Sequence, residues 1–189
     1  AVKMLFTRED DAHLDQPRSP SVSNLSATLN DDNEVIGNEH RFTSGWPTKA
    51  MAAGFLAPSK DGKKKIDMLS ASGSDHWYSL PNHKVLVYNN DLAQKTFVPG
   101  WLRSVGPGWI QWSVESFMDE LAHKSGQDPA EFRRALIDAQ GRQSGSAHHS
   151  VGGSNRLKND LNELTKKFCT LNTFDPTEAQ LCVSPGCHR

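Results

Sequence analysis

Apolar residues in the second half of the chain recur at the spacing of an α-helix. Between Val114 and Leu121 they follow the i, i+3, i+4, i+7 pattern, which places them on one helix face. Ser113 precedes this run and can cap a helix through its hydroxyl group, while Gly126 is placed to end it. The pattern predicts a buried helix between these two residues.

A second helix is predicted immediately after the first. Asp128 is its expected N-cap, Pro129 takes the first helical position, and the Glu131 carboxylate can reach back toward the cap. Ser154 begins a third pattern, in which the large apolar residues between positions 157 and 168 share one face, opposite lysines and glutamates.

Shorter apolar runs in the first half of the chain predict β-strands. Residues 1–6 are apolar enough for a buried strand, and residues 7–20 read as a polar loop with two prolines. Residues 21–30 and 33–42 alternate apolar and polar positions around an Asp-Asp pair, which is typical of a hairpin. Residues 83–90 form a further strand.

The connection between these strands, residues 44–75, is rich in Gly, Ser, Ala, Lys and Pro. Long ordered loops of this kind tend to be functional or to pack on a partner. Within it, residues 51–57 suit a short helix or a buried turn.

Strands followed by helices give an α+β fold class, with antiparallel strands and then two or three packed helices. From Cys169 onward the apolar residues follow no helical or strand spacing, and we expect residues 169–189 to form an irregular tail.

The charge balance argues against several classes of function. Lysine and arginine total 21 against 22 acidic residues, a balance that gives no general field for nucleic acid or anionic lipid. The basic run from Lys60 to Lys65 reads as a solvated loop in preference to a phosphate or partner contact, and we assign it no function. No apolar run approaches the roughly 18 residues needed to span a bilayer, so direct membrane insertion is not expected. The sequence as given carries no secretory signal.

Three cysteines, Cys169, Cys182 and Cys187, lie in the last 21 residues. Their spacing matches no structural zinc site or redox motif, and their odd number leaves the redox compartment undetermined. Cys182, Cys187 and His188 could surround a metal, but a crowded tail without a metal is favoured.

Arg103 is the strongest candidate for a functional side chain. It lies in the stretch RSVGPG, where Gly106 and Gly108 allow backbone to approach a ligand closely and to present N–H groups to an anion. Its guanidinium offers a fixed fork of donors suited to phosphate, carboxylate or an oxo group. The alternative is an arginine paired with a local carboxylate beside a tight turn.

Other polar clusters favour structural explanations. His148 and His149 are adjacent in a Gly/Ser segment, which is typical of a solvated loop. The acidic run at residues 8–11 reads as a polar turn. His76, beside Trp77 and Tyr78, suits a structural hydrogen bond better than stacking or substrate binding. No Ser-His-Asp or Cys-His nucleophile pattern can be defended.

Several stretches together resemble one protein family. They are GWLRSVG at 100–106, ESFMDELAHKSGQDPAEFRRAL at 115–136, VKMLFTREDD at 2–11, SDHWYSLPNH at 74–83 and GSAHHSVGGSNRLKNDL at 145–161. In their order along the chain they resemble the molybdopterin-binding large subunit of the xanthine dehydrogenase and aldehyde oxidase family. The nearest branch contains isoquinoline 1-oxidoreductase beta subunits and membrane-associated aldehyde dehydrogenases. The resemblance covers roughly residues 1–168, which we expect to form a partial molybdopterin-binding domain.

The resemblance assigns roles to individual residues. It implies that Arg103 contacts the molybdenum cofactor near its oxo ligand or the bound substrate. It implies further that backbone at Leu102 and Gly106 approaches the cofactor. Trp101 and Trp109 would then wall the site, although buried packing is the commoner place for such tryptophans.

The family's reaction is the hydroxylation of an aldehyde or N-heterocycle carbon, with oxygen drawn from water. The resemblance implies a molybdenum–molybdopterin cofactor in its cytosine dinucleotide form and iron–sulfur clusters on a partner small subunit. It also implies a cytochrome c subunit, and a place in the bacterial periplasm or a membrane-associated complex. The cofactor carries the oxidation, and the protein supplies position and electrostatics.

Two parts of the family pattern are missing from the sequence. Neither the glycine-rich cofactor loop before the TREDD motif nor the segment with the catalytic glutamate is present, and Glu163 and Glu178 lie in other contexts. We therefore expect the chain to be inactive alone. The alternatives are a non-catalytic truncated or frame-shifted remnant and a small subunit that completes a split enzyme.

Overall fold

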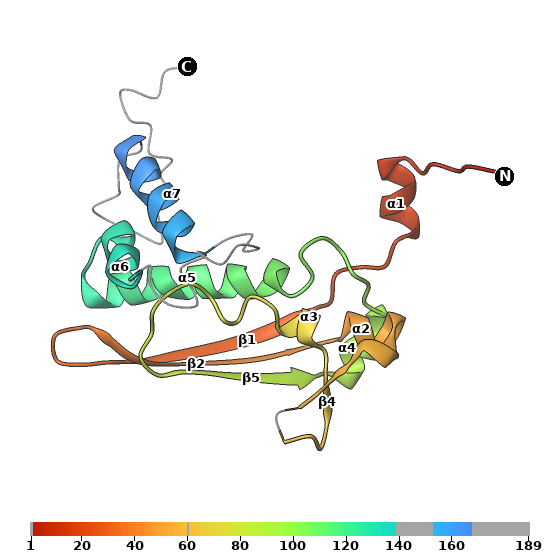
Figure 1. The fold of residues 1–189 in the computed structure, drawn as a ribbon, viewed down its shortest axis with the longest axis horizontal. Helices are drawn as coiled ribbons and strands as arrows, with labels where there is room; N and C mark the ends of the chain where they lie inside the picture. Colours follow the sequence, from red (N-terminus) through yellow and green to blue (C-terminus); the bar gives the residue numbers. More distant parts are fainter. Residues whose placement is uncertain (1, 60, 139–152, 168–189) are drawn as a thin grey trace. The chain divides into compact units, whose positions relative to one another are not determined.

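A computed structural model describes residues 2–59, 61–138 and 153–167 of the chain (Figure 1). The chain divides into two compact units. The first comprises Ala1–Ser26, Glu39–Asp75 and Lys84–Ser113, and the second comprises Ala27–Asn38, His76–His83 and Val114–Arg189. The fold is α+β, as the sequence predicted, with a strand-rich first half and a helical second half.

Three strands form the main sheet, in the order β1-β2-β5. They are β1 (Ser21–Leu29), β2 (Val35–Ser44) and β5 (His83–Asn89). The turn between β1 and β2 contains Asn33 at φ 61°, a left-handed conformation that asparagine tolerates better than most residues. The predicted hairpin and the predicted later strand are therefore confirmed.

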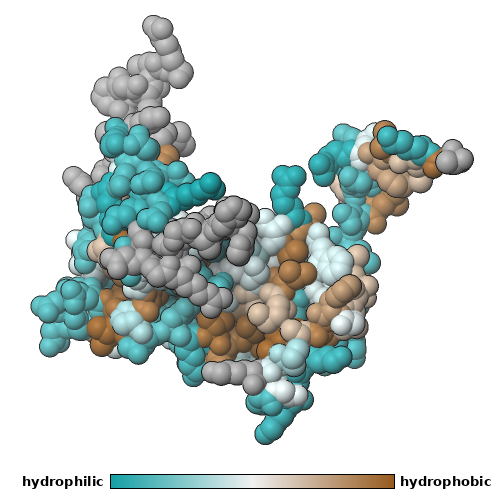
Figure 2. Space-filling model, in the orientation of Figure 1, coloured by the Kyte–Doolittle hydropathy of each residue, from teal (hydrophilic) through white to brown (hydrophobic). Residues whose placement is uncertain are grey.

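The N-terminal segment differs from the prediction. Residues 2–6 pair with no strand in the described part of the chain, and Leu5 is 80% exposed. The predicted polar loop instead contains helix α1 (Arg8–Leu14). Thr7 and Asp10 form a capping box, in which the Asp10 N–H donates to Thr7 Oγ1 and the Thr7 N–H donates to Asp10 Oδ2. Local capping thus favours a helix here, and Figure 2 shows apolar surface exposed on this N-terminal part.

The long connection after β2 is broken into short ordered elements. Residues 51–57 contain a single exposed turn of 3-10 helix and not a buried one. The basic run ends in a small antiparallel hairpin, where Ala57 pairs with Ile66 and the described lysines are exposed. The elements are α2 (Pro47–Met51), η1 (Ala53–Phe55), β3 (Ala57–Pro58), β4 (Lys65–Ile66) and α3 (Met68–Ala71).

Helix α5 (Pro107–Ser125) starts earlier than predicted. Ser113 lies inside it and donates its hydroxyl to the Trp109 carbonyl at 3.1 Å, so it bonds to the preceding turn and caps nothing. The helix starts at Pro107 because proline suits the first helical position. Its end is as predicted, since Gly126 has φ +69° and closes the last turn.

The remaining helices follow their local signals closely. The Asp128 carboxylate accepts from the N–H groups of Ala130 and Glu131, so it caps α6 (Pro129–Ala135) as predicted. Glu131 pairs with Arg134, not with the cap.

Two further helices are α4 (Asp91–Phe97), which the sequence analysis missed, and α7 (Ser154–Lys167). His148, His149, the three cysteines, His188 and the predicted tail at 169–189 lie outside the described residues.

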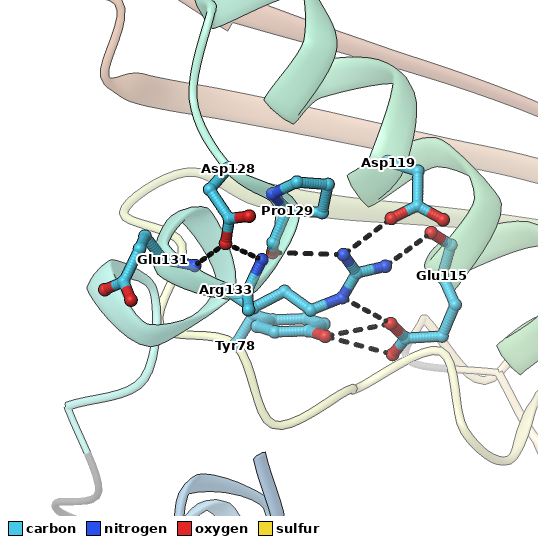
Figure 3. Close-up of polar contacts among 8 residues, drawn as sticks. Tyr78, Glu115, Asp119, Asp128, Pro129, Glu131 and Arg133 are labelled. Carbon is cyan, nitrogen blue, oxygen red and sulfur yellow. Dashed lines mark hydrogen bonds and ion pairs between the residues drawn. The ribbon is translucent and has the colours of Figure 1, made fainter. Parts of the chain in front are cut away.

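A charged network around the largely buried Arg133 holds α5 to α6 in the second unit (Figure 3). Arg133 donates from Nε to Glu115 Oε2 at 3.0 Å and from Nη1 to Asp119 Oδ1 at 2.7 Å. Tyr78 is only 3% exposed and donates its hydroxyl to Glu115 Oε2 at 2.9 Å. Burial raises the pKa of Tyr78, and the Glu115 carboxylate raises it further.

Candidate functional site

The turn from Leu102 to Gly106 is the most strained segment near the predicted site. Ser104 has φ 73° and Val105 has φ 43°, both in the left-handed region. For a β-branched residue such as valine this conformation is a genuine outlier, because its side chain crowds the backbone. Such backbone persists only where surrounding contacts fix it. We refer to Leu102–Gly106 as the Arg103 turn.

Gly106 seals the inner side of the Arg103 turn against α3. Its N–H donates to the Leu69 carbonyl at 3.2 Å, and a Cβ added to it would lie 2.5 Å from that same oxygen. Carbonyls of Ser70 and Ser72 would be nearly as close, at 2.8 and 2.9 Å. The absence of a side chain at Gly106 therefore serves backbone packing within the first unit. A contact between Gly106 and a cofactor stays a prediction.

A second arginine lies over the turn. Arg18 donates from Nη2 to the Arg103 carbonyl at 2.9 Å and from Nη1 to the Val105 carbonyl at 3.3 Å. Its guanidinium occupies the space beside Gly108, where an added Cβ would lie 1.5 Å from Arg18 Nη1. Gly108 is thus small because Arg18 fills the space, and we predicted no role for Arg18 from the sequence.

Trp101 anchors the entry to the turn. Its indole Nε1 donates to Thr48 Oγ1 at 3.2 Å, and Thr48 Oγ1 in turn donates to Asp67 Oδ1 at 2.6 Å. Asp67 is fully buried, and its carboxylate also accepts from the Thr48 N–H and from both the N–H and the hydroxyl of Ser70. This buried carboxylate therefore joins α2, α3 and the segment leading to Arg103.

The side chain of Arg103 is exposed and available. Within residues 2–59, 61–138 and 153–167 it makes no hydrogen bond or ion pair, so the alternative of a local carboxylate partner is wrong for the described chain. The backbone N–H groups of Arg103 and Ser104 also find no acceptor among the described residues. Leu102 and Trp101 beside it are 40% and 42% exposed, whereas Trp109 is 7% exposed and packs in the core.

Two arginines are associated with this turn. Arg103 belongs to it and Arg18 contacts its carbonyls, and neither side chain forms an ion pair with a described carboxylate. The turn leads into the N-terminus of α5, whose dipole adds partial positive charge. A guanidinium fork next to free N–H groups suits an anion with oxygen acceptors. The residues present therefore fit an anionic cofactor, and no cluster of His, Cys, Asp or Glu in the described chain could bind a bare metal.

Other sequence candidates are structural in the described chain. His76 is buried, and its ring stacks on that of His83 with centroids 4.6 Å apart. The acidic run at residues 8–11 forms most of α1, whose first turn favours negative charge. No described helix is long and apolar enough to cross a membrane.

Sequence comparison identifies a related enzyme. The chain is 43% identical over 166 residues to the membrane-bound aldehyde dehydrogenase [pyrroloquinoline-quinone] of Gluconacetobacter polyoxogenes. The matched part covers 88% of this chain and 21% of that enzyme, so the chain spans about a fifth of its relative's length. No family model matches the chain.

Structural comparison agrees on the fold. The aldehyde oxidoreductase of Desulfovibrio gigas matches with a TM-score of 0.54 and 21% identity, over 81% of this chain and 15% of that one. The aldehyde oxidoreductase of Desulfovibrio desulfuricans matches with a TM-score of 0.45 and 18% identity, over 80% of this chain and 16% of that one. The chain therefore has the fold of one part of an aldehyde oxidoreductase. The predicted resemblance to a segment of this oxidoreductase family is confirmed.

Proposed function

We propose that the chain is the part of an aldehyde-oxidising oxidoreductase that holds the anionic end of a molybdenum–pterin cofactor. One observation carries the proposal: Arg103 projects an exposed guanidinium, with no partner in the described chain, from a strained turn fixed by Gly106 and Arg18. The turn fixes the backbone from which the guanidinium extends, and the planar fork of an arginine loses less entropy per hydrogen bond formed than a lysine ammonium does.

The roles of the residues follow from their positions. Arg103 would donate hydrogen bonds to anionic oxygens, and the free N–H groups of Arg103 and Ser104 would add further donors. The exposed apolar surfaces of Trp101 and Leu102 would exclude water from the cofactor's flank. The cofactor, when bound, supplies the oxidation of the substrate carbon. Residues outside this chain must supply the general base and the remaining contacts.

The relative's name supports an aldehyde over an N-heterocycle as the substrate class. The same name introduces a second cofactor candidate, because it gives pyrroloquinoline quinone for that enzyme. This quinone carries three carboxylates, which an arginine fork also binds. The cytosine dinucleotide form of the pterin, an iron–sulfur small subunit, a cytochrome c subunit and a periplasmic or membrane-associated location remain predictions. So does the assignment of residues 1–168 as a partial cofactor-binding domain.

A titration of the isotope-labelled chain tests the proposal, with molybdate and pyrroloquinoline quinone as separate probes. We expect molybdate to shift the Arg103 Nε–H and the amide signals of Arg103 and Ser104, with the rest of the spectrum unchanged. Arg103→Gln should abolish these shifts. Arg8→Gln is the matched control, because Arg8 is an exposed arginine whose ion pair with Asp11 is 3.9 Å long.

Each outcome has a definite meaning. Molybdate shifts that depend on Arg103 support the oxo-metal cofactor, and shifts seen only with pyrroloquinoline quinone move the proposal to the quinone. Equal responses in the Arg8→Gln and Arg103→Gln variants, or no response to either probe, would refute an anion site at the turn.

A further inference from the structure

Arg18 forms hydrogen bonds with the backbone of the strained Arg103 turn. Its two hydrogen bonds go to the carbonyls of Arg103 and Val105, which lie on both sides of the left-handed residue Ser104. A planar guanidinium can satisfy two diverging acceptors at once, whereas a lysine ammonium is a single point charge on a flexible stem. The contact is therefore specific to arginine and not merely to positive charge.

The segment that carries Arg18 is itself firmly held within the first unit. The Gly100 N–H donates to the Pro17 carbonyl at 3.1 Å, and Ser19 Oγ donates to the Gly45 carbonyl at 2.8 Å. A Cβ added to Gly100 would lie 2.6 Å from the Gln16 Cβ, so backbone and side chain are in close contact here. The backbone around Arg18 is therefore held in place, and the side chain extends from it to the turn.

The strained backbone gives this contact its importance. Valine and serine side by side in the left-handed region are both unfavourable, and they persist only where other contacts oppose relaxation. Gly106 fixes one end of the turn through its hydrogen bond to α3, but it forms no hydrogen bond with the carbonyl of Arg103. Arg18 supplies that missing restraint.

We propose that Arg18 is a positioning residue that holds the Arg103 turn in its left-handed form and so fixes the backbone from which the Arg103 side chain extends. This inference rests on the proposed function of Arg103. The two hydrogen bonds from Arg18 to the turn, which we call the clamp, can be tested separately. Arg18 is expected to act through the turn and not to touch the cofactor, because both of its observed bonds go to backbone carbonyls.

Amide hydrogen exchange on the labelled chain tests the clamp directly. In Arg18→Gln we expect exchange of the Val105 and Gly108 amides to rise about tenfold or more, because loss of charge-assisted bonds opens the turn locally. Amides of Val114 and Met118 should exchange as in the unaltered chain. Arg18→Lys should behave like Arg18→Gln, and Arg8→Gln should leave the turn unchanged.

A second variant removes the clamp without altering charge. Gly108→Ala places a methyl group where Arg18 Nη1 now lies, so it should displace the guanidinium. Alanine favours the helix more than glycine, so α5 itself should not weaken. We expect the turn amides to exchange faster in this variant while the amides of α5 do not. Free guanidinium at low millimolar concentration should restore protection in Arg18→Gln and not in Gly108→Ala, where the space is filled.

Binding measurements separate this inference from the proposed function. Molybdate affinity should fall about tenfold in both Arg18→Gln and Gly108→Ala, and guanidinium should rescue only the former. Unchanged exchange in both variants would overturn the clamp, even if Arg103→Gln still abolished binding. Faster turn exchange with no response to molybdate or to pyrroloquinoline quinone in the unaltered chain would support the clamp and refute the proposed function. A uniform rise of exchange across α5 would show that Arg18 acts only on overall stability.

Discussion

Trp101 and Thr48 are joined by a hydrogen bond from the indole N–H to the threonine hydroxyl, with a length of 3.2 Å. The acceptor hydroxyl also donates to the buried carboxylate of Asp67. One small side chain thus links the entry of the Arg103 turn to the polar centre of the first unit. The relationship gives a direct test of how the turn is supported.

Thr48→Val keeps the size of this side chain and removes both bonds. We expect a loss of about 1–3 kcal/mol in the free energy of unfolding, because the Asp67 carboxylate stays buried with one donor fewer. The Trp101 indole should become more mobile and more exposed to water. Urea unfolding checks the first result. Fluorescence quenching, in a background in which Trp101 is the one tryptophan kept, checks the second. Thr43→Val, on β2, is the control; equal losses in the two variants would contradict the proposed support.

Tyr78 makes stability depend on alkaline pH. Burial and the Glu115 carboxylate raise its pKa in the folded chain above the value of about 10 found in the unfolded chain. Above pH 10 the folded state therefore holds a proton that the unfolded state has lost, and the free energy of unfolding should fall by about 1.4 kcal/mol per pH unit. Below pH 10 this contribution is constant.

Tyr78→Phe should remove that alkaline slope, measured by urea unfolding at a series of pH values. The chain has only one other tyrosine, Tyr88, which is 51% exposed and offers a matched control. Tyr88→Phe should keep the slope. An identical slope in both variants would show that Tyr78 is not the group responsible.

Gly106 should tolerate no side chain. Gly106→Ala would force a methyl group against three carbonyl oxygens of the α3 segment, and we expect a loss of about 2–3 kcal/mol in the free energy of unfolding. Gly54→Ala is the control, since an added Cβ there meets nothing within 4 Å. Equal thermal stability of the two variants would contradict the close packing under the Arg103 turn.

Local signals were readable from the sequence, whereas contacts between distant segments were not. The cap at Asp128, the helix end at Gly126 and the β1–β2 hairpin depend on neighbouring residues, and all three are confirmed. The prediction for residues 1–6 was wrong because a strand requires a partner that the described chain does not provide.

The candidate site shows the same limit. Arg103 could be selected from its glycine-rich turn and its family resemblance. Arg18 could not, because its contacts join residues 85 and 87 positions apart and no local pattern marks them. The Thr48–Asp67 pair was equally hidden, although Asp67 before Met68 is a recognisable N-cap signal. Gly106 and Gly108 were noticed for a ligand, but the structure gives each a packing reason.

The central claim is that Arg103 holds an anionic metal–pterin cofactor. Its most direct test is the molybdenum and pterin content of the protein purified with its natural partner chains, with Arg103→Ala compared with Arg8→Ala. The account predicts near-stoichiometric molybdenum in the unaltered protein and in Arg8→Ala, and a loss of about tenfold or more in Arg103→Ala at equal recovery of folded chain. Equal molybdenum in both variants, or none in the unaltered protein, would contradict the account.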